Sequence, residues 1–224
     1  MNKLLIIHPY DVTTLFLRPI TDSLSSSFYD VIEIVKVNPT QQDHSDVFFK
    51  LSTLPSGSTV AFLGHGSSDC IYSAADSDFK AYPFINEHNI NVFDNVNLLC
   101  FSCRSADFLR KTFSKNKILA SIGFDDIPTS FQEVIDARET DSTEYVNFTE
   151  STIEVFNLEL VTIMSKTLES FLKYDLSFIG LFDFLTLYIN QSIYNRLIDL
   201  SRPDNLAIAN QLKLLKRNMK FFIS

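Results

Sequence analysis

The sequence predicts an α/β protein built around a mostly parallel sheet, and three observations predict this class. Over roughly the first 130 residues, apolar segments of strand length alternate with segments whose apolar residues recur every three or four positions. The apolar segments are continuous, which is typical of strands that helices cover on both faces. From about residue 143 onward, only the helical spacing continues.

Each predicted strand is an apolar run that ends at residues which interrupt strands. We expect strands at residues 4–8, 31–37, 59–63, 96–101 and 117–123. The segments between them have helical spacing, and we expect helices at 13–26, 44–53, 84–89 and 105–113. Right-handed crossovers would join the parallel strands.

The chain divides into three parts by composition. Residues 1–130 carry the α/β pattern and form the predicted core. Residues 131–142 follow Pro128, are polar and acidic, and are expected to form a loop. Residues 143–224 are expected to be helical, with helices at 176–200 and 204–220, and to pack on or beside the core.

Composition and charge narrow the classes of function. The 224 residues are 46% hydrophobic and 21% charged, which favours a packed globular protein over a disordered one. The formal net charge of −8 disfavours nucleic-acid binding, because such a surface repels phosphate backbones. The 3 cysteines, an odd number, argue for a reducing compartment. No apolar run reaches membrane-spanning length without charges, so we expect a cytoplasmic protein without a membrane span.

Two neighbouring strands of the predicted sheet end in residues that carry chemistry. The run 59–63 is followed by Gly64, His65 and Gly66, and the run 96–101 is followed by Ser102 and Cys103. The carboxyl ends of adjacent parallel strands meet at one edge of a sheet, where ligands bind. A thiol beside an imidazole is the minimum requirement for a cysteine nucleophile with a general base. The sequence therefore predicts His65 and Cys103 as a catalytic pair.

The residues beside this pair have supporting chemistry. Cys103 precedes a predicted helix, whose N-terminal partial charge, together with Arg104, is expected to lower the pKa of the thiol. The backbone N–H groups at this turn are also placed to receive an oxyanion. Gly66 leaves room for another segment to approach His65.

The combination of His-Gly after one strand and Cys after the next resembles the caspase-like cysteine peptidases, and most closely those with a CHAT domain. In this family the histidine is the general base, and the cysteine, preceded by a small residue, is the nucleophile. The resemblance covers roughly residues 1–130 and rests on the segments Phe-Leu-Gly-His-Gly-Ser-Ser and Leu-Leu-Cys-Phe-Ser-Cys-Arg-Ser. It implies a caspase-like three-layer sandwich with a helical C-terminal extension.

The activity that the resemblance implies is acyl transfer at a peptide bond, without a cofactor or a metal. Cys103 would attack the carbonyl carbon, and His65 would protonate the leaving amine and later activate water. Backbone N–H groups at Cys103 and Gly66 would hold the oxyanion. The partners would be a peptide or protein substrate and an activating protein. Compact bacterial members act on dedicated partners in defence or regulated cell death, which extends to this chain by analogy.

Family members that cleave after Lys or Arg place a carboxylate in the pocket for that side chain. The candidates for this role are Asp69, Asp125 and Asp126.

The sequence also departs from the family pattern, and other functions stay open. The caspase motif Gln-Ala-Cys-x-Gly is absent, and Phe101 stands where metacaspases have an acidic residue. The main alternative is a catalytically inactive binding or regulatory module of the same fold. A thiol redox protein could use Cys100 and Cys103, which have the spacing C-x-x-C. A metal site could use His8, His65 and Cys103, although no closely spaced ligand pair supports it.

Overall fold

The structure of the chain is a computed structural model that describes residues 3–141, 145, 147–199 and 201–224. The strands are β1 Leu4–Pro9, β2 Ile32–Val37, β3 Thr59–Leu63, β4 Cys70–Tyr72, β5 Pro83–Asn86, β6 Asn97–Phe101, β7 Ala120–Gly123 and β8 Lys220–Ile223. The α-helices are α1 Arg18–Ser27, α2 Gln41–Ser52, α3 Ser105–Thr112, α4 Phe131–Thr140, α5 Glu150–Lys173, α6 Phe178–Ile198 and α7 Asn205–Asn218. Short 3-10 helices lie at Leu15–Leu17, Ile90–Phe93 and Phe113–Lys115.

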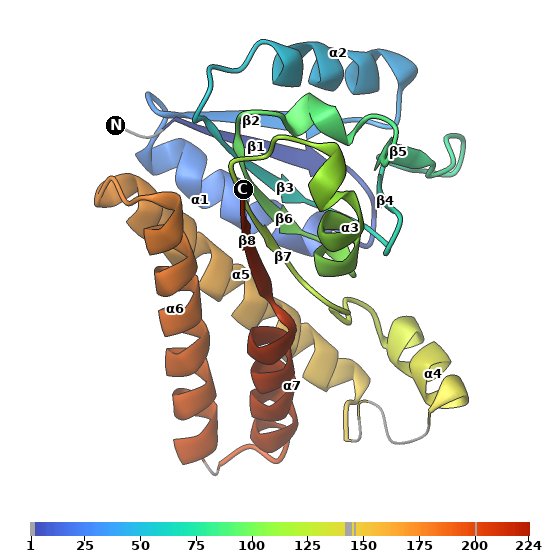
Figure 1. The fold of residues 1–224 in the computed structure, drawn as a ribbon. Coiled ribbons are helices and arrows are strands. Elements are labelled where there is room, and N and C mark those ends of the chain that lie inside the picture. The colour runs from blue at the N-terminus through green and yellow to red at the C-terminus, as the bar shows by residue number, and fades with distance from the viewer. Residues whose placement is uncertain (1–2, 142–144, 146, 200) are drawn as a thin grey trace.

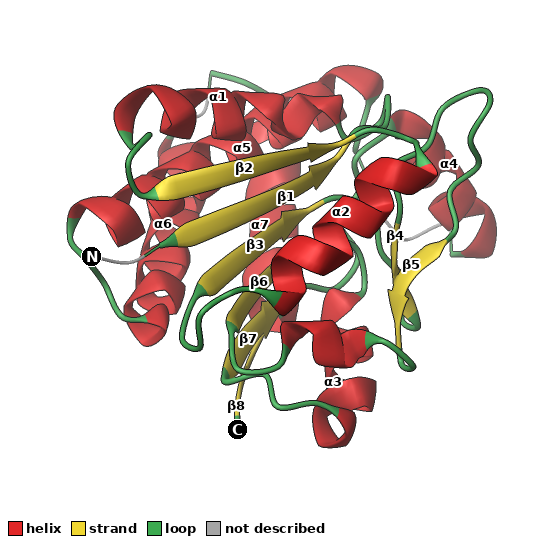
Figure 2. Cartoon of the chain, turned by 90° about the horizontal axis from the view of Figure 1, so that it is seen from above, coloured by secondary structure: helices red, strands yellow, loops and turns green. Residues whose placement is uncertain are grey.

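A six-stranded sheet in the order β2-β1-β3-β6-β7-β8 runs through the centre of the molecule, and helices cover both of its faces (Figure 1 and Figure 2). The first five strands in this order are parallel to their neighbours, whereas β8 is antiparallel to β7. The chain is therefore an α/β protein with a mostly parallel sheet in three layers, as the sequence predicts. The five strands predicted from the sequence correspond to β1, β2, β3, β6 and β7.

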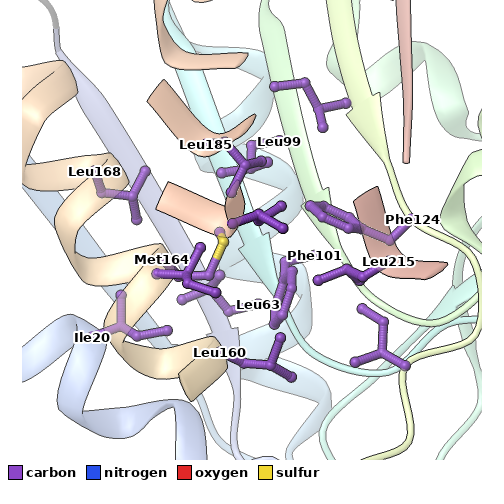
Figure 3. Packing of buried hydrophobic residues seen from close by; sticks show 14 of the residues in the cluster. Ile20, Leu63, Leu99, Phe101, Phe124, Leu160, Met164, Leu168, Leu185 and Leu215 are labelled. Carbon is purple, nitrogen blue, oxygen red and sulfur yellow. The ribbon is translucent and has the colours of Figure 1, made fainter. Parts of the chain in front are cut away.

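Each face of the sheet carries its own hydrophobic core, because successive strand residues point to opposite faces. On one face, Leu63 and Phe101 pack with Met164 of α5 and Leu185 of α6 (Figure 3). Helices α1 and α7 complete this cluster. On the other face, the alternate strand residues pack against α2, α3 and the β4–β5 hairpin. Strands β1, β3 and β7 are buried along their whole length, which explains why their apolar runs are continuous.

The C-terminal helices pack directly on the sheet, which is one of the two placements expected from the sequence. The helix predicted at 204–220 ends earlier, at Asn218, and the chain then forms β8. Phe221 and Phe222 pair with Ile122 and Ser121 of β7. The aromatic pair suits a strand, and its addition covers the edge of β7 that would otherwise stay unpaired. The C-terminal part thus contributes both a covering layer and an edge strand to the core.

The predicted loop at 131–142 is wrong over most of its length, because residues 131–140 form α4. The Ser130 side chain accepts a hydrogen bond from the Glu133 N–H, and the Glu133 carboxylate accepts from the Ser130 N–H. This reciprocal capping box satisfies two N–H groups at the helix start and outweighs the polar composition. The expected boundary between residues 142 and 143 lies outside the described residues.

The predicted helix at 84–89 is also wrong. Residues 83–86 form β5, which pairs with β4. The Asn89 side chain accepts a hydrogen bond from the Asn86 N–H and donates to the Phe84 carbonyl, and this side-chain turn ends the strand. A short 3-10 helix then follows at residues 90–93.

Candidate active site

The ends of β3 and β6 form one continuous edge of the sheet. The two strands are adjacent and parallel, and their last residues, Leu63 and Phe101, are partners in the register. The segments that leave this edge carry His65 and Cys103, respectively. The topology therefore brings both candidate residues to the same place.

The loop after β3 lies directly against the loop after β6, and Gly66 permits this contact. A Cβ atom at Gly66 would lie 2.6 Å from the Ser102 Oγ and 3.0 Å from the Cys103 carbonyl oxygen. No side chain fits at such distances without a shift of the backbone. A glycine is thus required here for close approach of the two loops rather than for an unusual backbone angle.

His65 and Cys103 line one common cavity, with Ser102, Ile127 and Thr129 among its other walls. The cavity has a volume of only about 10 Å³, which is room for about one water molecule. The pair is therefore assembled at one site, but the site is closed in this conformation.

The imidazole of His65 is held by a short chain of hydrogen bonds from the loop after β1. Its Nε2 lies 2.5 Å from the Thr13 Oγ1, and the Thr13 hydroxyl donates to the Asp11 Oδ1 over 2.5 Å. Because the single hydroxyl proton goes to Asp11, the Thr13 oxygen accepts from an Nε2–H of His65. This assignment leaves the Nδ1 lone pair of His65 as its basic atom.

Asp11 is well suited to anchor this chain as a carboxylate. Burial alone would raise its pKa, but hydrogen bonds from the Thr13 hydroxyl and N–H, together with His65, bring the pKa of Asp11 below its ordinary value. The Asp11 Oδ1 also lies 3.4 Å from the His65 Nε2. The sequence analysis missed Asp11 and Thr13, although they follow the first strand at the same sheet edge as His65.

The thiol of Cys103 is covered by protein. Its Sγ donates a hydrogen bond to the carbonyl oxygen of Ile127 over 3.2 Å. The residue keeps some exposed surface, but densely packed atoms surround its sulfur. Among the described residues, no hydrogen bond joins Cys103 to His65, so the two groups share a cavity without being in contact as donor and acceptor.

The pKa of the Cys103 thiol is shifted opposite to the sequence expectation. Burial raises it to about 12, and the carboxylates of Glu133 and Asp126 add to the effect. Arg104, expected to lower this pKa, instead lies with its Nε 3.7 Å from the Asp126 Oδ1. In this conformation, the N-terminus of α3 does not outweigh the loss of water around the sulfur.

The turn after Cys103 is sharp, because Arg104 has a left-handed backbone with a φ of 54°. Such a conformation is strained for a residue with a side chain, and strained residues are frequent next to reactive groups. The Arg104 N–H donates to the Asp125 carbonyl over 3.2 Å, which helps to hold the turn. Arg104 thus positions the backbone beside the thiol, in addition to pairing with Asp126.

Two backbone N–H groups next to the cavity donate to no backbone acceptor within the described part of the chain, those of Gly66 and Cys103. The Cys103 N–H interacts with its own sulfur. The neighbours of Gly66 are engaged, since Ser67 N–H and His65 carbonyl both bond to the β4 segment. These are the two N–H groups that the sequence analysis expects to hold an oxyanion.

The three candidate substrate-pocket carboxylates occupy different surroundings. Asp69 forms an ion pair with Lys111, with 2.8 Å between Oδ1 and Nζ, and 76% of its side chain is exposed. Asp125 accepts a hydrogen bond from the Asn218 side chain of α7 over 2.9 Å. Asp126 faces Arg104, its side chain is 60% exposed, and its charge is one of the causes that raise the pKa of the Cys103 thiol. Of the three carboxylates, Asp126 is thus the one with a stated electrostatic effect on Cys103.

The geometry gives little support to the redox and metal alternatives. Cys100 belongs to the core on one face of the sheet, whereas Cys103 packs against the core on the other. Burial raises the pKa of Cys100 to about 11. Among the described residues, no group of three or more His, Cys, Asp or Glu side chains is placed to hold a metal ion. His8 is buried in β1, where its Nε2 contacts the Thr14 carbonyl.

No protein-family model matches the chain, and no curated protein is significantly similar to it. In the part of the chain that the structure describes, none of the helices is both long and apolar enough to cross a membrane.

Proposed function

We propose that this chain is a caspase-like cysteine endopeptidase, with Cys103 as the nucleophile and His65 as the general base. The shared cavity of these two residues, at the carboxyl edge of adjacent parallel strands, is the observation that carries the proposal. The close contact that Gly66 allows between the two loops supports it further. The proposed partners are a cytoplasmic peptide or protein substrate and an activating protein.

The proposed reaction begins when the His65 Nδ1 takes the proton of the Cys103 thiol. The sulfur attacks the substrate carbonyl carbon, and the C=O electron pair moves to oxygen, where the N–H groups of Gly66 and Cys103 stabilise the negative charge. The tetrahedral intermediate collapses, the C–N bond breaks, and the leaving nitrogen takes the proton from His65.

A water molecule then completes the reaction. It gives a proton to His65 while its oxygen attacks the thioester carbon. Breakage of the C–S bond releases the carboxylic acid, and the Cys103 sulfur recovers its proton from His65. Asp11 and Thr13 assist both steps, because they keep the His65 ring in one orientation and one tautomer.

For substrate recognition, we propose that Asp126 pairs with a cationic side chain next to the scissile bond. Its negative charge reaches the nucleophile, whereas Asp69 is neutralised by Lys111 and Asp125 is bonded to Asn218. A substrate Lys or Arg would compete with Arg104 for the Asp126 carboxylate.

A non-catalytic binding module is the second candidate, and the covered thiol is the observation that favours it. A cysteine whose pKa is raised to about 12 is a poor nucleophile at neutral pH. The module would use the same surface for recognition and leave Cys103 as a core residue.

The experiment that tests the proposal is cleavage of a diverse peptide library by the wild type and by Cys103→Ala. Cleavage by the wild type alone, preferentially after Lys or Arg, is the expected result, and Asp126→Asn should weaken that preference. Equal cleavage by both chains would show a contaminating protease. If the wild type cleaves no peptide even when the Cys103 thiol is accessible to solvent, the binding module is favoured.

A further inference from the structure

The segment that covers Cys103 is attached to the rest of the molecule in an unusual way. We call residues 126–129, which lie between β7 and α4, the strap. In the described structure, every hydrogen bond of the strap backbone runs to a side chain: Ile127 O accepts from Cys103, Thr129 N–H donates to Glu133, and Thr129 O accepts from Asn157. The strap can therefore move without breaking a backbone ladder.

The chain on either side of the strap is fixed much more firmly. On one side, the Phe124 carbonyl accepts from the Ala106 N–H over 2.8 Å, and the Asp125 carbonyl accepts from the Arg104 N–H. On the other side, Ser130 begins α4 with its capping box. These anchors define the two ends of the strap. Within it, the Ile127 side chain is only 3% exposed and belongs to the core between the sheet and the helices, so opening of the strap must also displace this side chain.

Asn157 is the contact through which the helical layer holds the strap. Its Nδ2 donates to the Thr129 carbonyl over 2.9 Å. Among the described residues its buried Oδ1 has no hydrogen-bond partner. A buried amide that satisfies only one of its polar atoms loses part of the stabilisation it could give. The hydrogen-bonding hold of α5 on the strap backbone is thus a single side-chain bond.

We propose that the strap is an autoinhibitory cover: it occupies the Cys103 thiol in the resting protein, and its release from Asn157 of α5 exposes the nucleophile. The proposal rests on the proposed function, since it describes regulation of that same site. The proposal explains why the proposed base, His65, is held in position while the proposed nucleophile, Cys103, is covered. Activity would then scale with the fraction of molecules whose strap is open.

The first test measures alkylation of Cys103 by iodoacetamide, which requires an exposed thiol but no peptidase activity. Asn157→Ala should increase the alkylation rate at Cys103 by about tenfold, which corresponds to about 1.4 kcal/mol and lies within the net contribution of one hydrogen bond. Asn190→Ala is the matched control, because it also removes an asparagine whose side chain makes a hydrogen bond from a helix, here as acceptor from Lys216, away from the strap. An unchanged rate in a folded Asn157→Ala chain would overturn the proposal.

The second test uses the wild type alone and keeps the proposal falsifiable if Asn157→Ala does not fold. The alkylation rates of Cys103 and of Cys100, which lies inside β6, are measured at increasing urea concentrations below the unfolding transition. If the strap opens locally, the Cys103 rate should depend only weakly on urea, whereas the Cys100 rate should rise steeply with global unfolding. Identical urea dependence of both cysteines would contradict a local opening.

Peptide cleavage by the same chains separates this proposal from the proposed function. If Asn157→Ala is alkylated faster but cleaves no peptide, the proposal of an autoinhibitory strap is retained and the proposed peptidase function is disproved. Cleavage by the wild type as fast as by Asn157→Ala would support the peptidase and disprove the strap.

Discussion

The two residues of the candidate pair, His65 and Cys103, differ sharply in their surroundings. His65 is held from one side by Asp11 and Thr13, and 28% of its side chain stays exposed. Cys103 is surrounded by packed atoms, and its thiol proton is engaged by the Ile127 carbonyl. Under the proposed function, this difference would mean that the base is already arranged for proton transfer, whereas the nucleophile is protected.

This contrast has a structural origin in the loops that follow the strands. The loop after β3 contacts the loops after β1 and β6, and side chains from three neighbouring strand ends meet there. The Cys103 turn instead faces the segment after β7, which continues into α4 and touches the helical layer. The loops at the sheet edge therefore hold His65, whereas the segment that covers Cys103 contacts the helical layer.

The largest expected effect is that of removing the His65 imidazole. His65→Ala should reduce peptide cleavage by about 10²- to 10⁴-fold, the usual contribution of a general base. His88→Ala is the matched control, because 86% of the His88 side chain is exposed and it lies away from the cavity. The measurement is kcat/KM on the best peptide from the library. Equal losses in the two variants would mean that His65 has no special role.

The covered thiol predicts an unusual pH dependence of alkylation. Since burial raises the pKa of Cys103 to about 12, the rate in the folded chain should rise about tenfold per pH unit from pH 7 to 10 without levelling off. In urea-unfolded chain the rate should level off near the ordinary thiol pKa of about 8.5. A plateau of the folded chain below pH 8 would mean that the thiol is activated rather than protected.

The raised pKa of Cys103 also predicts how the free energy of unfolding changes with pH. Above about pH 8.5 the unfolded chain releases the thiol proton that the folded chain retains, so unfolding becomes progressively more favourable up to about pH 12. The contribution of Cys103 to the free energy of unfolding is thus complete below pH 8.5 and is lost at alkaline pH. Urea unfolding of the wild type and Cys103→Ala at pH 7 and pH 10 should show a smaller alkaline loss in the variant.

The contact between the two loops predicts an effect of intermediate size. Gly66→Ala would place a Cβ atom 2.6 Å from the Ser102 Oγ and 3.0 Å from the Cys103 carbonyl oxygen, so we expect relief of the overlap to move the His65 loop away from the Cys103 loop. We expect the free energy of unfolding to fall by about 1–3 kcal/mol, as is typical of overpacking. Gly180→Ala in α6 is the control, because its Cβ would lie no closer than 3.2 Å to any neighbour, the Cβ of Leu176 just before the helix. Urea unfolding of both variants, together with cleavage, checks this.

Much of the sheet was predictable from the sequence because each central strand is a buried apolar run with a clear end. Strand β8 was not, since Phe221 and Phe222 directly follow a helix and their pairing with β7 spans about a hundred residues. The start of α4 did have a local signal, Ser130 followed by Glu133, which a reading based on polar composition overlooked.

The candidate site shows the same division. The positions of His65 and Cys103 follow from strand order, and that rule applied to the first strand would also have found Asp11 and Thr13. The cover over Cys103 could not be predicted, because no spacing pattern links a cysteine to a carbonyl 24 residues further along the chain. The pKa expected for Cys103 was therefore wrong in direction, since local sequence gives the helix terminus but not the burial.

The smallest predicted effect concerns the hydroxyl between Asp11 and His65. Thr13→Val keeps the shape of the side chain but removes the hydroxyl, so the His65 Nε2–H loses its acceptor and the ring can rotate. We expect kcat to fall by about tenfold, since misplacement of a catalytic group has costs of this order or larger. Thr13→Ser restores the hydroxyl and should recover most of the activity.

A purely structural role of Thr13 would give a different pattern, in which both substitutions change stability and neither changes kcat selectively. Comparison of kcat with KM adds a second readout, because loss of the orientation of the His65 ring should lower kcat while KM stays nearly unchanged. An unchanged kcat in Thr13→Val would mean that the His65 side of the site is no better prepared than the Cys103 side.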